Sequence, residues 1–130
     1  MSIAIYNQSA LVGGVLIESE TIGWLYRGAE RIGRVEVDWG EEDQEHEATV
    51  FVAGNPCAGV TVERYGRSLG RIHRGLSDVG EVRPEGTGVC AIYRDAQKIG
   101  RLEAKATGLS MKHLMLFGGA GAAVLLGLCG

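Results

Sequence analysis

The stretch YRDAQKIGRLEA, residues 93–104, decides the fold, because an earlier segment of the chain nearly repeats it. Residues 26–37 read YRGAERIGRVEV, with the same Tyr-Arg opening and the same Ile-Gly-Arg, whose glycine follows the tyrosine by seven residues. After that glycine, apolar Val35 and Val37 alternate with acidic Glu36 and Asp38. A period of two is typical of a strand with one buried face. Each copy therefore predicts a strand, a short turn and a second strand.

Short words of the form apolar-Gly-x-apolar recur along the chain at intervals of ten, ten, twenty-six, eleven, ten, eight and twelve residues. The polar connections between them, such as RGAER and RDAQK, have lengths that suit hairpin turns. No fifteen-residue window before Ser110 has the uninterrupted three- and four-residue apolar spacing of a helix. We therefore predict an all-β repeat meander of about ten-residue strand units, forming a roll, small barrel or short solenoid. The glycines of these words are Gly13, Gly23, Gly33, Gly59, Gly70, Gly80, Gly88 and Gly100.

The units IYRDAQKIGRLE and LYRGAERIGRVE resemble those of small uncharacterised bacterial proteins with tandem Ile-Tyr-x-x-x-Gly-x-x-Ile-Gly-Arg-Val units. The resemblance covers most of residues 1–105 and implies a β-repeat fold, but it carries over no catalytic residues. Ala29 and Ala96 stand where the turn glycine of that unit belongs.

The length of 130 residues suits one domain, which we divide into a β-repeat domain at 1–110, with an acidic insertion at 38–48, and a hydrophobic tail at 111–130. A net charge of -3 argues against a nucleic-acid partner, since such partners attract clustered Lys and Arg. The N-terminus lacks the basic segment of a cleavable secretion signal, so a cytoplasmic protein is expected.

No catalytic or metal-binding motif stands out. The three histidines, His46, His73 and His113, are not at metal-ligand spacing from one another or from a cysteine, and no phosphate loop or nucleophile elbow is present. The three cysteines, Cys57, Cys90 and Cys129, lie among apolar or small residues and suggest free thiols in a reducing compartment. We therefore expect neither an enzyme nor a bound cofactor or metal.

Two charged features are candidates for interaction. The acidic insertion, which includes Glu41, Glu42 and Asp43, suits a solvated or partner-facing loop better than a calcium site, because its spacing is not that of a calcium-binding loop. Arg34, Arg94 and Arg101 recur in the repeat units and could form a ladder beside strand glutamates. Either the ladder is paired within its own chain, or it meets the acidic insertion of a neighbouring copy.

The tail contains seventeen uncharged residues, 114–130, which as a helix would extend for about 25 Å, at the lower limit for spanning a bilayer. Gly119, Ala123 and Gly127 lie at four-residue spacing, which lets two membrane helices approach closely. The tail suits a C-terminal membrane anchor, an element buried between copies in an oligomer or filament, or a core helix or closing strands folded over the β domain.

The function these features favour is structural: a self-associating β-repeat scaffold subunit, forming a homo-oligomer or filament by pairing of strand edges and attached to a membrane by its tail. The alternative is a binding module whose strand face presents Tyr6, Tyr26, Tyr65 and Tyr93 to a carbohydrate or peptide.

Overall fold

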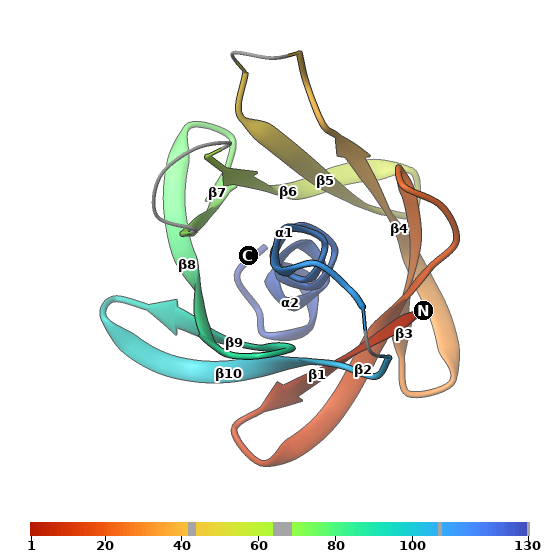
Figure 1. Ribbon diagram of the computed structural model, residues 1–130, viewed down its shortest axis with the longest axis vertical. Helices are drawn as coiled ribbons and strands as arrows, with labels where there is room; N and C mark the ends of the chain where they lie inside the picture. The colour runs from red at the N-terminus through yellow and green to blue at the C-terminus, as the bar shows by residue number, and fades with distance from the viewer. Residues whose placement is uncertain (42–43, 64–68, 107, 130) are drawn as a thin grey trace.

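The computed structural model describes residues 1–41, 44–63, 69–106 and 108–129. Ten antiparallel strands follow one another around a closed barrel, because the first strand also pairs with the last (Figure 1). The prediction of an all-β meander is confirmed, and among the expected shapes it is the barrel that forms. The strands are β1 (Ser2–Asn7), β2 (Ala10–Ile17), β3 (Ile22–Arg27), β4 (Glu30–Asp38), β5 (His46–Val52), β6 (Asn55–Val62), β7 (Gly70–Arg74), β8 (Ser77–Gly86), β9 (Val89–Arg94) and β10 (Gln97–Ala104).

Closure gives every strand a neighbour on both sides, so the described strands present no free edge. Edge-to-edge pairing, the route to assembly that the sequence suggests, is therefore closed to this barrel, since a barrel removes the unpaired backbone groups of an open sheet. Any association between copies must use the outer face of the barrel or one of its ends.

Five hairpins make up the barrel, and each has a two-residue turn. In every one of these turns the first central residue has a positive φ, and at Asp95-Ala96 and Ala53-Gly54 both residues do. Positive φ at both central positions is the type I′ pattern, whose twist matches that of the paired strands. The first central residues are Gln8, Gly28, Ala53, Gly75 and Asp95.

A bulge in the second strand of each hairpin explains the recurring word. One extra residue stands out of register in each case, and in four of the hairpins it is the apolar residue that precedes the glycine. These bulge residues are Val12, Ile32, Cys57, Val79 and Ile99, and all five pack against the core. The residue after the bulge is glycine in four hairpins and Ala58 in the fifth.

The four glycines share one reason for being glycine. A Cβ added at Gly13, Gly33, Gly80 or Gly100 would lie 2.1 to 2.8 Å from a main-chain carbonyl oxygen of the next strand. That carbonyl belongs in each case to an aromatic residue: Tyr26, Phe51, Tyr93 and Tyr6 respectively. The recurring word at these four positions therefore marks a hairpin whose backbone closely approaches the neighbouring strand.

The tail forms a helix inside the barrel (Figure 1). It runs through α1 (Met111–His113), the π-helical segment η1 (Leu114–Gly118) and α2 (Gly119–Leu125), together called the central helix. Residues 114–123 are buried all round, which is why this helix is apolar on every face. A Cβ at Gly118, Gly119 or Gly121 would lie 2.7 to 2.8 Å from the side chains of the barrel wall. The glycines thus make the helix narrow enough for the lumen.

The tail takes the third of the positions considered from the sequence, that of a core helix. Its buried residues share one core with residues 1–110. Gly119 packs against Val82 and Val60, Ala123 is buried in the same core, and Gly127 ends the helical region with a φ of +78°. Among the described residues, no helix is long and apolar enough to cross a membrane.

Candidate interaction surface

An aromatic side chain stands at the same position on the outer face at each of the five seams where one hairpin meets the next. These residues are Tyr6, Tyr26, Phe51, His73 and Tyr93, each on the first strand of its hairpin. Their register partners on the preceding strand are Arg101, Gly14, Arg34, Gly59 and Glu81 respectively. The barrel therefore has a pseudo-fivefold outer belt, whose seams can be compared with one another.

Three of the five seams are charged. The guanidinium of Arg34 lies 4.6 Å from the ring of Phe51, and its Nε is 2.6 Å from the carboxylate of Glu36. Arg83 similarly lies 4.2 Å from the ring of Tyr93 and 2.7 Å from Glu81. A cation over an exposed ring contributes roughly 0.5–1 kcal/mol, and an exposed ion pair adds less, so each seam is weakly stabilised.

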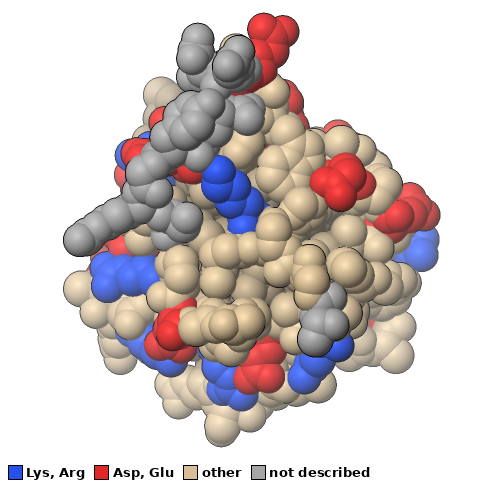
Figure 2. All heavy atoms as spheres, in the orientation of Figure 1, with Lys and Arg blue, Asp and Glu red and all other residues tan. Residues whose placement is uncertain are grey.

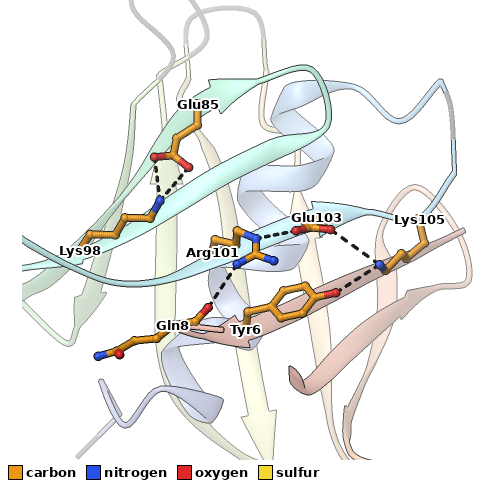
Figure 3. Close-up of polar contacts among 7 residues, drawn as sticks. All are labelled: Tyr6, Gln8, Glu85, Lys98, Arg101, Glu103 and Lys105. Carbon is orange, nitrogen blue, oxygen red and sulfur yellow. Dashed lines mark hydrogen bonds and ion pairs between the residues drawn. The ribbon is translucent and has the colours of Figure 1, made fainter. Parts of the chain in front are cut away.

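The third charged seam closes the barrel between β10 and β1 (Figure 3). The guanidinium of Arg101 lies 4.1 Å from the ring of Tyr6, donates to the main-chain oxygen of Gln8 at 3.2 Å, and pairs with Glu103 at 2.5 Å. Lys105 donates to the hydroxyl of Tyr6 at 3.4 Å. The last copy of the repeat thus joins the C-terminal strand to the N-terminal one.

The predicted interaction residues do not come together as one ladder. Arg34 and Arg101 lie on different seams, each engaged within its own chain, and Arg94 is exposed at the end of β9. Glu41 is exposed in the acidic insertion, whereas Glu42, Asp43 and Tyr65 lie outside the described residues. Glu45 of the insertion is 3.7 Å from Arg71 of the same chain. Seen along the barrel, basic and acidic side chains are interspersed around the rim (Figure 2).

The seam between β2 and β3 differs from the charged ones. Gly14 and Leu16 occupy the positions that hold Arg34 and Glu36 on β4, so Tyr26 has a glycine as its register partner. A Cβ at Gly14 would lie 2.4 Å from the main-chain oxygen of Ile3, which keeps this position free of a side chain. The result is an apolar groove of about 370 Å³ over β1, β2 and β3, with Leu11, Leu16, Tyr26 and Lys105 among its lining residues.

Leu11 is 63% exposed and Leu16 is 43% exposed, both on the outer face of β2. Sequence reasoning missed this surface, although a signal was present: VGGVLI of β2 aligns with IGRVEV of β4 and lacks its Arg and Glu. The groove and its two exposed leucines, called the β2 patch, are the candidate interaction surface.

A polar cluster fastens the central helix where it enters the barrel. Ser110 caps the helix by accepting the N–H of His113 at 3.1 Å, and the two side chains are also hydrogen bonded through His113 Nδ1. His113 Nε2 is 2.6 Å from Glu20, which follows β2. Trp39 packs against the His113 ring and donates its indole N–H to the main-chain oxygen of Glu20 at 2.7 Å. The serine, histidine and glutamate thus hold the helix to the rim.

Buried His46 contributes to the same end of the barrel, with Nδ1 2.7 Å from the main-chain oxygen of Trp39. His73 is 3.0 Å from the hydroxyl of Thr61 on the outer face. His46 and His113 thus both pack against Trp39, whereas His73 lies apart from them. Within the described part of the chain, no three His, Cys, Asp or Glu side chains could together hold a metal ion.

Comparison of the chain with protein-family models, with curated proteins and with solved structures finds no match.

Proposed function

We propose that the protein is a structural, self-associating barrel, and that a second copy of the chain docks on the β2 patch. The observation that supports this is the exposed leucine at the seam between β2 and β3, where Gly14 and Leu16 replace the charged pair of the repeat. Exposed leucines around a groove are typical of interaction sites. The positions equivalent to Gly14 and Leu16 carry an arginine and a glutamate at three seams, and Gly59 and Thr61 at the remaining one. The seam between β2 and β3 thus offers a surface for association in a barrel whose strands have no free edge.

A two-fold arrangement suits this patch. Leu11 and Leu16 lie on the same outer face, toward opposite ends of β2, with Gly14 between them. A two-fold axis through Gly14 would place Leu11 of one copy against Leu16 of the other, so that each patch buries its equivalent, as cyclic dimers require. The two groups of leucines bury little area, so a weak dimer is expected.

Attachment to a membrane is the less supported part of the sequence hypothesis. The apolar residues that would enter lipid already pack inside the barrel, so an anchor would require the central helix to leave the lumen. Withdrawal would expose both the helix and the lining of the barrel to water, at a large cost in hydrophobic free energy. We therefore propose association through the β2 patch without an anchor.

The experiment is sedimentation velocity of the reduced full-length chain over a hundredfold range of concentration. We expect a concentration-dependent dimer in the wild type and a monomer in the L11K/L16E variant, whose new side chains copy Lys98 and Glu36 of the charged seams. Leu76→Ser is the matched control, since Leu76 is an exposed leucine outside the patch. A wild type that stays monomeric throughout the range, or a dimer that persists in L11K/L16E, would refute the proposal.

A binding module for a carbohydrate or peptide is the second candidate, but the three described tyrosines, Tyr6, Tyr26 and Tyr93, do not form one face. Tyr6 and Tyr93 lie on separate seams with an arginine over each ring, so of the described tyrosines only Tyr26 lines the groove. This candidate therefore rests on Tyr26 and the neighbouring Trp24, and binding abolished by Tyr26→Ala would support it. The L11K/L16E variant separates the two functions, because loss of the dimer does not require loss of the Tyr26 ring.

A further inference from the structure

The five bulge residues form a ring at the hairpin end of the barrel, around the last residues of the central helix. Four members of this ring are valine or isoleucine, and the fifth, on β6, is Cys57. All five are partly buried and pack against the same core. Valine fills the equivalent position at Val12 and Val79, so packing alone does not require a thiol on β6.

The C-terminal residues bring a second thiol to this ring. The helix ends at Leu125, and Gly127 turns the chain with a φ of +78°. The N–H groups of Leu128 and Cys129 then both donate to the main-chain oxygen of Ala123, at 2.8 and 3.0 Å. Leu125, Leu126 and Leu128 lie against Gly13, Gly100 and Gly80, which belong to three successive hairpins around the barrel. Cys129 follows in the direction of the next hairpin, β5–β6, where its thiol interacts with that of Cys57. Both side chains remain partly exposed, within reach of a small reagent.

We propose that Cys57 and Cys129 are a redox site, which closes to a reversible intramolecular disulfide and ties the end of the central helix to the barrel wall. The oxidant is a low-molecular-weight disulfide of the glutathione class. The sulfur of Cys57 attacks one sulfur of that disulfide and releases the first small thiol. Cys129 then attacks the Cys57 sulfur of the mixed disulfide and releases the second. The protein loses two thiol protons and two electrons, and the reagent gains them as two small thiols.

The burial of Cys129 indicates which of the two thiols attacks the small disulfide first. Burial, with a smaller contribution from the neighbouring Cys57, raises the pKa of Cys129 to about 12, so its thiol is protonated at neutral pH. Because the thiolate is the attacking species, Cys129 is the poorer first nucleophile. The first step therefore belongs to Cys57, and Cys129 acts once the mixed disulfide is held beside it.

The disulfide would have a mechanical consequence. It would close a loop over residues 57–129, which includes most of β6, the four strands β7 to β10 and the whole central helix. A cross-link over a long loop restricts the unfolded chain strongly, so the oxidised protein should resist unfolding better than the reduced one. The helix could not leave the lumen while the bond is intact. Reduction would restore that freedom without changing any other contact of the barrel.

The experiment uses the full-length chain, incubated with oxidised glutathione, denatured, and alkylated with iodoacetamide. Tryptic cleavage separates the three cysteines onto peptides 35–64, 75–94 and 113–130. We expect one alkylated thiol per oxidised chain, at Cys90, and a cross-linked pair of peptides 35–64 and 113–130. The unfolding midpoint in urea should rise on oxidation and return to its starting value after reduction.

Cys57→Val is the main control variant, because valine stands at two other positions of the ring and should preserve the packing. It should form no intramolecular disulfide, and its unfolding midpoint should not respond to glutathione. Cys90→Ala leaves the pair intact and should oxidise as the wild type does. The proposal is overturned if the wild type keeps three alkylatable thiols, if only glutathione adducts or disulfides between chains form, or if Cys57→Val responds to oxidation equally.

Discussion

The main-chain oxygen of Tyr6 lies 2.4 Å from the position that a Cβ at Gly100 would occupy. Both atoms belong to paired strands, β1 and β10, so neither can move without disturbing the closing seam. Replacing Gly100 with alanine should therefore destabilise the barrel by about 1–3 kcal/mol, the usual range for overpacking in a close contact. Urea unfolding, followed by circular dichroism, measures this change.

Gly86→Ala is the matched control for that substitution. Gly86 also lies in a strand, β8, but nothing stands within 4 Å of its added Cβ. We expect its free energy of unfolding to stay within about 1 kcal/mol of the wild type, as for most exposed substitutions. Equal losses in the two variants would show that the carbonyl contact is not what requires glycine at position 100.

Gly23 and Phe117 should be energetically coupled. A Cβ at Gly23 would lie 2.8 Å from the Cδ1 atom of Phe117, which is fully buried in the central helix. Gly23→Ala should destabilise the protein, and Phe117→Leu, which leaves room at that point, should reduce the added cost of the alanine. A double-mutant cycle on urea unfolding should give a coupling of about 1 kcal/mol or more, within the range for residues in contact. Strictly additive effects would contradict the fit of this helix against β3.

Ala96 and Ala29 occupy the position of the turn glycine in the repeat unit that the chain resembles. Replacing each with glycine should change the free energy of unfolding in opposite directions. Ala96 has a φ of +64°, which costs a residue with a Cβ roughly 1 kcal/mol, so Ala96→Gly should stabilise the β9–β10 hairpin by about that amount. Ala29 follows Gly28 in its turn and is not among the residues of positive φ. Ala29→Gly should therefore destabilise by about 0.5 kcal/mol, through the larger freedom of the unfolded chain. The same sign in both variants would contradict the turn geometry.

Much of the fold can be predicted from the sequence, because local chemistry determines it. The alternation after Gly33 and Gly100 predicts strands, and the short polar connections predict the hairpins. The sequence cannot show that β10 pairs with β1, since closure depends on how twist and register accumulate over ten strands. It also suggests an outer ladder for Arg101, whose actual role is in the closing seam with Tyr6 and Glu103.

The tail shows why composition alone misleads. An uncharged segment rich in glycine and alanine can be buried in the lumen of a barrel as well as in lipid. Both environments are apolar, and in both a narrow helix packs closely against its neighbours. The choice depends on whether Val15, Val82 and Leu102 of the wall provide a complementary surface, which is a property of the assembled barrel. The β2 patch is hard to predict from the sequence for a different reason. It is defined by the absence of the arginine and the glutamate at Gly14 and Leu16, and only the strand register shows that these positions correspond to Arg34 and Glu36.

The buried thiol of Cys90 predicts a loss of stability at alkaline pH. Its Sγ lies 3.3 Å from the Sδ of Met111, and burial, with a smaller effect of Glu85, raises its pKa from 9.0 to about 12. In the folded protein the thiol keeps its proton at pH values where the unfolded chain has released it. Its contribution is therefore complete below pH 9 and is lost as the pH rises from 9 toward 12.

Comparison of the wild type with Cys90→Ala isolates this effect, since the tyrosines, lysines and other cysteines titrate in both proteins. Cys90→Ala should be the less stable protein at pH 8, because it leaves a small cavity in the core. At pH 10.5 the advantage of the wild type should have fallen by about 2 kcal/mol, at 1.36 kcal/mol for each pH unit above the unfolded pKa. Urea unfolding under reducing conditions at the two pH values measures the difference. An advantage that stays constant between them would mean that Cys90 is accessible to hydroxide in the folded barrel, against its burial beneath Met111.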